Sequence, residues 1–229
     1  MDEHTNTFTE GQILLINKPL YWTSFEVVKK IRFLTKTKKV GHSGTLDPLA
    51  TGLLIICTGK YTKRISEFMA QEKEYTGTIT LGATTPTFDR ETDPKIFKSI
   101  EHINEEQMQM TAQFFTGNIM QVPPIHSAIK KDGRRAYESA RKGIDIKLEP
   151  REITIHEFSI EKIDLPMVYF KVVCSTGTYI RSLANDFGAQ LGCGGYLSSL
   201  CRTRIGSFLN SEAKTIEQFE MEMNEMNSI

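Results

Sequence analysis

The stretch GHSGTLDPLATGLLIIC, residues 41–57, joins a segment rich in small residues to a continuous apolar run. Glycines stand at positions 41, 44 and 52, and Pro48 follows Asp47, the one carboxylate of the stretch. Glycine lets the backbone approach a ligand closely, and proline fixes a turn. The run LLIIC, residues 53–57, predicts a buried strand. The stretch therefore predicts a loop that shapes the wall of a pocket, with Asp47 inside it.

Asp47 has two interpretations. An aspartate before a proline is most often a turn former. A loop of roughly a dozen residues between a helix and a buried strand, dense in small residues, is more typical of a functional segment. The residues of this loop alone leave both interpretations open.

Length and composition narrow the class of protein. The chain has 229 residues and a mass of 26.0 kDa, enough for one large domain or two small ones. No apolar run reaches the roughly 18 residues of a membrane helix, and the polar N-terminus is unlike a secretory signal, so we expect a cytoplasmic protein. The four cysteines form no C-x-x-C pair, and the five histidines lack metal-ligand spacing. We therefore expect no bound metal.

Basic residues are concentrated in two segments, although the formal net charge is zero. One segment is KKIRFLTKTKK, residues 29–39. The other spans residues 130–151, in which eight Lys and Arg residues accompany four acids. Segregated charge of this kind permits a face that binds phosphates, and a pair of solvated helix faces is the alternative.

Apolar periodicity and turn residues predict a mixture of strands and helices. Strands are expected at residues 12–18, 53–57, 74–82, 152–163, 167–175 and 195–208, and helices at residues 24–34, 63–70, 104–115, from Arg134, 178–192 and 215–223. Thr23 with Glu26, and Asn104 with Gln107, are spaced as capping pairs. Because the elements do not alternate strictly as βαβ units, we predict an α+β fold with a mixed, largely antiparallel central sheet and flanking helices.

Two common catalytic motifs fail on inspection. A Walker A loop needs G-x-x-x-x-G-K-[ST], but Gly59-Lys60 is followed by Tyr61, and Leu54 stands where the first glycine belongs. A nucleophile elbow needs G-x-S-x-G, and residues 41–45 place the second glycine one position too early. These patterns exclude nucleotide hydrolysis of the Walker type and serine-esterase chemistry.

Five stretches, in order along the chain, resemble the TruB family of pseudouridine synthases. They are INKPLYWTSFEVV, GHSGTLDPLATGLLIICTGKYTK, KEYTGTITLGATTPTFD, QVPPIHSAIKKDGRRAYESARKG and CSTGTYIRSLANDFGAQLG. The resemblance covers about residues 12 to 208, nearly the whole chain. The first stretch departs from the family's KP-x-G-x-[ST]-S pattern, because Tyr21-Trp22 replaces the step that contains glycine.

The resemblance implies an isomerase that converts uridine to pseudouridine, with Asp47 as nucleophile and Arg181 as the ion-pair partner of Asp47. Tyr75 would stack on the displaced base and assist proton removal. The residues expected to bind substrate are His42, Tyr179, Leu200 and, in an RNA-gripping insertion at 121–151, Lys130, Arg134, Arg135 and Arg141. Read without the resemblance, Arg181 is more typical of a surface helix arginine and Tyr75 of a half-buried strand tyrosine. Tyr179 has the same two interpretations as Tyr75, with a pocket wall favoured. Leu200 could be a core leucine and His42 a structural histidine.

The sequence DPLATG is similar to that of stand-alone bacterial members, which implies action on uridine 55 in the T-loop of tRNA without a guide RNA. The resemblance further implies a catalytic domain at 12–210 and a short acidic tail at 211–229 in place of a PUA domain. Because the isomerisation is redox-neutral, no cofactor is expected, and we expect a monomer. The alternatives are a synthase acting on another RNA, or an RNA-binding or tRNA-folding protein without essential catalysis; intact Asp47, Tyr75 and Arg181 argue against the latter.

Overall fold

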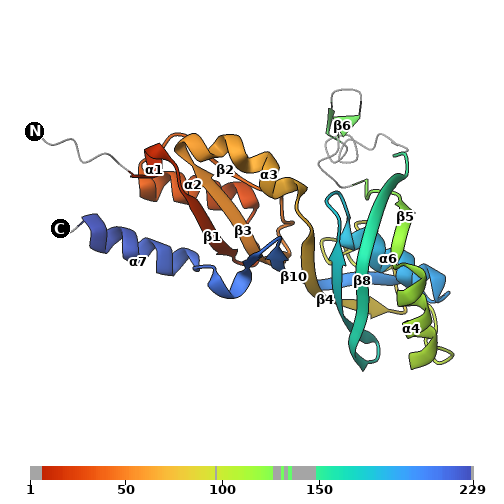
Figure 1. The fold of residues 1–229 in the computed structure, drawn as a ribbon. Helices are drawn as coiled ribbons and strands as arrows, with labels where there is room; N and C mark the ends of the chain where they lie inside the picture. Colours follow the sequence, from red (N-terminus) through yellow and green to blue (C-terminus); the bar gives the residue numbers. More distant parts are fainter. Residues whose placement is uncertain (1–6, 96, 126–129, 132–133, 136–147, 228–229) are drawn as a thin grey trace, which may run out of the picture. The chain divides into compact units, whose positions relative to one another are not determined.

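The computed structural model describes residues 7–95, 97–125, 130–131, 134–135 and 148–227. The chain divides into two compact units (Figure 1). Unit 1 comprises Met1–Tyr75 and Leu200–Ile229, and unit 2 comprises Thr76–Ser199. Across the described residues, no helix combines the length and apolar character needed to cross a membrane.

Unit 1 is a sheet with helices around it. Its strands are β1 (Ile13–Lys18), β2 (Val40–His42), β3 (Ala50–Thr58) and β11 (Phe208–Leu209), and its helices are α1 (Thr7–Glu10), α2 (Ser24–Thr35), η1 (Gly59–Arg64), α3 (Ile65–Ala70), η2 (Asn210–Glu212) and α7 (Ile216–Asn227). Strands β4 (Lys73–Leu81) and β10 (Gly195–Ile205) each run from one unit into the other. Strand β3 pairs antiparallel with β1 and β2 and parallel with β10.

In unit 2 the sheet continues with the strand order β10, β4, β9, β8 and β5. Its own elements are α4 (Glu105–Phe114), β5 (Gly117–Gln121), β8 (Arg151–Asp164), β9 (Met167–Cys174) and α6 (Ile180–Gln190), together with the two-stranded hairpin of β6 (Lys130–Lys131) and β7 (Arg134–Arg135). The pairs β8–β9 and β5–β8 are antiparallel. A largely antiparallel mixed sheet with flanking helices confirms the predicted fold class.

Helix α2 forms where the sequence supplies both a start signal and an apolar face. Thr23 and Glu26 make the predicted capping box, in which Thr23 Oγ1 accepts from the Glu26 amide at 3.1 Å and Glu26 Oε2 accepts from the Thr23 amide at 2.7 Å. The helix ends at Lys36, which has a left-handed backbone with φ 50°. Four apolar residues at helical spacing face the core: Val27, Val28, Ile31 and Leu34.

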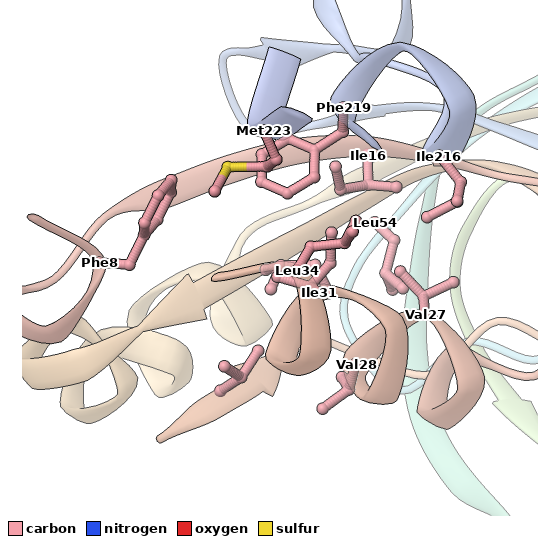
Figure 2. Packing of buried hydrophobic residues seen from close by; sticks show 12 residues of the cluster. Phe8, Ile16, Val27, Val28, Ile31, Leu34, Leu54, Ile216, Phe219 and Met223 are labelled. Atoms are coloured by element: carbon pink, nitrogen blue, oxygen red, sulfur yellow. The ribbon is translucent and has the colours of Figure 1, made fainter. Parts of the chain in front are cut away.

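The core of unit 1 joins an early segment of the described chain, at Phe8, to its last helix, α7 (Figure 2). Ile16 of β1 and Leu54 of β3 pack with the buried face of α2, and Ile216, Phe219 and Met223 of α7 complete the cluster. Phe8 meets Phe219 edge-on, with ring centroids 6.3 Å apart. The segment 211–229, expected as an acidic tail, thus contributes a helix whose apolar side is buried in this core.

Three segments differ from their sequence-based expectation. The loop expected at 41–52 is shorter, because His42 closes β2 and β3 begins at Ala50, which leaves residues 43–49. Residues 63–70, expected as one helix, divide between η1 and α3. The helix expected from Arg134 is wrong at its start, since residues 134–135 form β7; residues 136–147 lie outside the described residues.

Candidate active site

Asp47 lies on the short segment 43–49, between two strands that pair with each other. Strand β2 aligns His42 with Ile56 of β3, so the segment leaves and re-enters the same sheet. The backbone carbonyl of Asp47 accepts a hydrogen bond from the Ala50 amide at 3.0 Å, which closes a turn over Pro48. The side chain of Asp47 is half-buried. Asp47 is therefore a turn residue that carries a half-buried carboxylate.

The residue before Asp47 anchors the segment to α2. Leu46 is 3% exposed. Ser24 Oγ accepts from the Leu46 amide at 2.9 Å and donates to the Leu46 carbonyl at 3.1 Å. Because both backbone groups of Leu46 are bound by one buried hydroxyl, the position of the next residue is closely constrained.

Lys18, the last residue of β1, is a fully buried cation beside this segment. Its Nζ donates to the carbonyl oxygens of Pro19 at 2.9 Å and Trp22 at 2.6 Å, and lies 3.5 Å from that of Pro48. Burial lowers the pKa of Lys18 to about 8, while the negative charge of Asp47 acts in the opposite direction. Lys18 and Asp47 therefore interact electrostatically within unit 1.

Arg202 of β10 is a second buried cation, 1% exposed, on the same segment. Its Nε donates to the Leu53 carbonyl at 2.7 Å, and its Nη2 donates to the Gly44 carbonyl at 3.2 Å. These two carbonyls flank residues 45–52, so one guanidinium holds both ends of the Asp47 turn. Gly52, with φ +102°, allows the approach of β10, because a Cβ there would lie 2.4 Å from the Arg202 carbonyl oxygen.

The structure places His42, Leu200 and Tyr75 on strands of unit 1. His42 ends β2, and burial lowers its pKa, with the charge of Arg202 adding to the shift, which favours the neutral imidazole. Leu200 lies opposite Ala50 in the β10–β3 pairing and is only partly buried, unlike a core leucine. Tyr75, in β4, is 9% exposed.

In unit 2, Arg181 occupies the first turn of α6 and is 4% exposed, which excludes the surface interpretation. Its Nη1 donates to the Thr87 carbonyl at 3.3 Å and lies 3.6 Å from Oδ2 of Asp89. Asp89 is itself 3% exposed, so this is a buried pair. The predicted pairing of Arg181 with Asp47 would join the two units and stays a prediction.

Tyr179, the residue before α6, is held by a buried glutamine. Gln121 of β5 is 3% exposed; its Oε1 accepts from the Tyr179 amide at 2.8 Å, and its Nε2 donates to the Tyr179 carbonyl at 3.1 Å. These two hydrogen bonds resemble those between paired strands, and they fix the backbone directly before Arg181.

The predicted RNA-gripping residues fall partly on the β6–β7 hairpin. Its register sets Lys130 opposite Arg135 and Lys131 opposite Arg134. Arg141 lies outside the described residues.

Sequence reasoning missed four buried charged residues: Lys18, Lys73, Asp89 and Arg202. The available signal was a charged residue inside or beside an apolar run, as in ILLINKP and SLCRTRIGSF. That signal is weak, because a lysine or arginine at a strand end is usually exposed. Within the described parts of the chain, no group of three or more His, Cys, Asp or Glu side chains is arranged to hold a metal ion.

Comparison with known proteins defines the class. The sequence profile of the TruB family pseudouridylate synthase N-terminal domain matches residues 32–180, and that of the tRNA pseudouridylate synthase B C-terminal domain matches residues 181–228. The chain therefore belongs to the TruB family of pseudouridylate synthases.

Its relatives include the tRNA pseudouridine synthase B of Flavobacterium johnsoniae, 54% identical over 220 residues that cover 93% of this chain and 96% of the relative. The tRNA pseudouridine synthase B of Phocaeicola vulgatus is 49% identical over 218 residues, with 93% of each chain covered. Among solved structures, the crystal structure of a Cbf5-Nop10-Gar1 complex is similar with a TM-score of 0.76 and 27% identity. That match covers 97% of this chain and spans 57% of the length of the other.

Proposed function

We propose that this protein isomerises uridine to pseudouridine in tRNA, at position 55 of the T-loop, with Asp47 as the nucleophile. The 54% identity to a tRNA pseudouridine synthase B across almost the whole chain supports the reaction and the class of RNA. The observation that carries the role of Asp47 is its placement: a half-buried carboxylate on a segment held by buried side chains of β1, α2 and β10.

The reaction breaks the bond from uracil N1 to ribose C1′, rotates the ring and joins C5 to C1′; C5 loses its proton and N1 takes one up. The target base must leave its stack to be reached. Only the ionised carboxylate is a nucleophile, and attack on uracil C6 or on ribose C1′ needs the same placement of Asp47. No electrons are transferred, so the chemistry requires no redox cofactor.

Positive charge favours the ionised form of Asp47. Asp47 stabilises the ammonium of Lys18, and because this coupling is reciprocal, Lys18 stabilises the carboxylate of Asp47. Arg181 would add a charge that persists at every working pH. In the proposal, Asp89 fixes the Arg181 guanidinium from within unit 2, at 3.6 Å.

Four further side chains line the proposed pocket. Tyr75 stacks on the displaced base, and the neutral ring of His42 contacts the flipped nucleotide. Tyr179 and Leu200 form an apolar part of the wall of this proposed pocket. Unstacked loop nucleotides are the part of an RNA whose base edges are most accessible, and a T-loop presents them on a hairpin without any guide RNA. A tRNA substrate also implies a cytoplasmic location, and a single chain suffices for the proposed site.

Wild-type protein is expected to release one equivalent of tritium from a tRNA transcript labelled at C5 of uridine. The reason is that each isomerisation exchanges one C5 proton. Replacing uridine 55 by cytidine in the transcript should abolish the release, whereas replacing another loop uridine should not. Release that persists without uridine 55 would show a different target, and no release from a folded transcript would contradict the proposed function.

Removing the charge of the β6–β7 insertion is expected to weaken tRNA binding and to flatten its salt dependence. Replacing Lys130, Arg134, Arg135 and Arg141 together by alanine should reduce the slope of log K against log salt by about one for each phosphate that is no longer neutralised. The matched control replaces four exposed lysines, Lys60, Lys95, Lys98 and Lys162. Equal slopes for the two quadruple variants, measured by filter binding, would contradict a specific role for the insertion.

A further inference from the structure

Tyr21 has a backbone conformation that its side chain disfavours. Its φ is 68°, in the left-handed region, and its amide donates to the Pro48 carbonyl at 2.8 Å. An aromatic residue in this region is an outlier that persists where the surroundings fix it, often at a ligand site. Glycine adopts this conformation freely, and Tyr21 stands where the family pattern KP-x-G has glycine. The chain thus keeps the conformation of glycine and adds a phenol ring.

Packing within unit 1 does not explain why an aromatic ring stands at this position. The side chain of Tyr21 is 72% exposed, and that of Leu20 before it is 44% exposed. Trp22, by contrast, packs against the core cluster. The Tyr21 backbone is bonded to the residue that follows Asp47, so the exposed ring is carried beside the catalytic segment.

The outer face of α2, which begins three residues after Tyr21, also carries exposed aromatic and basic side chains. Phe25 is 55% exposed, and Lys29 Nζ lies 4.9 Å from the centre of its ring. One and two turns further along are exposed Arg32, Phe33 and Lys36, with Phe33 76% exposed. The opposite side of α2 faces the core in Figure 2. Among the described residues, neither Lys29 nor Lys36 has a carboxylate within ion-pair distance.

We propose that Tyr21, Phe25 and Lys29 form an RNA-docking surface beside the Asp47 segment. Tyr21 stacks on an unpaired nucleotide close to the target uridine, Phe25 widens the apolar platform, and Lys29 contacts a phosphate. Every base has a π face, so such a platform binds unstacked nucleotides in general. Exposed aromatic rings interleaved with lysines that lie outside ion-pair distance of any described carboxylate suit a polyanion, whereas lysine is depleted at protein interfaces. The inference rests on the proposed function for the identity of the RNA.

The variant Tyr21→Gly separates the effect of the left-handed backbone on stability from the effect of the ring on RNA binding. Glycine relieves the left-handed backbone, so the thermal midpoint should rise, while loss of the ring should weaken RNA binding by about 5- to 100-fold. Tyr21→Phe keeps the ring and should bind like the wild type. Affinity is measured for an unmodified T-arm stem-loop in an Asp47→Asn background, so that no turnover occurs. The fluorescence of Trp22, the single tryptophan, gives a second signal of docking next to Tyr21.

Phe97→Ala, at a ring that is 77% exposed in unit 2, is the matched control and should leave affinity unchanged. A more stable Tyr21→Gly protein that binds the stem-loop as tightly as its parent would overturn the inference, and a protein partner for this face would then be the alternative. Because binding is measured without turnover, this result is independent of tritium release. Failure of the proposed function would appear as no release by the wild type, whatever the affinities.

Discussion

The Asp47→Asn protein is expected to release no measurable tritium from C5-labelled tRNA, while the wild type completes one turnover. Asparagine preserves the size and the backbone of the turn but has no ionised form, so it cannot act as the nucleophile. Loss of an essential nucleophile typically lowers the rate by about 10⁴-fold or more. Single-turnover assays with enzyme in excess measure the chemical step directly and separate it from RNA binding.

The control for this substitution lies in the same chain. Asp93 also precedes a proline, Pro94, but it is exposed, and Asp93→Asn should retain full activity. Both variants should stay folded at the assay temperature, because the Ala50 amide, the Ser24 hydroxyl and the Arg202 guanidinium still bind the backbone of the Asp47 segment. Turnover by Asp47→Asn at more than a few per cent of the wild-type rate would remove Asp47 from the mechanism.

Local signals in the sequence predicted the helices best. The capping pair Thr23–Glu26 and the apolar spacing of α2 are contained within a dozen residues, and the structure confirms both. The pair Asn104–Gln107 likewise forms the predicted capping box of α4. A cap depends on side chains three residues apart, so no distant contact is needed to recognise it.

Non-local pairing explains where prediction of the fold fell short. Strand β2 has three residues and exists because it pairs with β3, so nothing in Val40–His42 alone identifies it. The same pairing shortens the Asp47 loop. At Arg134 the sequence favours a helix, but the residues pair with β6 as a hairpin instead. Strand propensity depends on the partner strand more than on the segment itself.

The candidate site was predicted in part. Asp47 drew attention through glycine density and a resemblance to a family, both visible in the sequence. Lys18 and Arg202 did not, because a buried cation is stabilised by carbonyl groups that come from distant segments: Pro48 for Lys18, and Gly44 and Leu53 for Arg202. Composition assigns such residues to the surface, and only the fold reveals that their charges are buried and hydrogen-bonded.

Arg202→Met is expected to lower both stability and the rate of the chemical step. Methionine fills much of the space but leaves the Gly44 and Leu53 carbonyls without their charged donor, which should cost about 2–5 kcal/mol in the free energy of unfolding. For a chain of this size that loss lowers the thermal midpoint by roughly 5–15 °C. Release of the Asp47 turn should also slow isomerisation on the order of 10²-fold at saturating tRNA, because a small displacement of a catalytic group is costly.

Arg204, two residues further along β10, is the matched control. Its guanidinium pairs with Glu72 at 2.6 Å and Glu74 at 3.7 Å near the surface, with 22% of its side chain exposed. Such a pair contributes at most about 1 kcal/mol, so Arg204→Met should change the midpoint by only a few degrees and leave the rate intact. Arg202→Lys keeps the charge but cannot reach both carbonyls, and it should fall between wild type and Arg202→Met. Equal effects of Arg202→Met and Arg204→Met on the single-turnover rate would show that the Asp47 turn does not depend on the buried guanidinium.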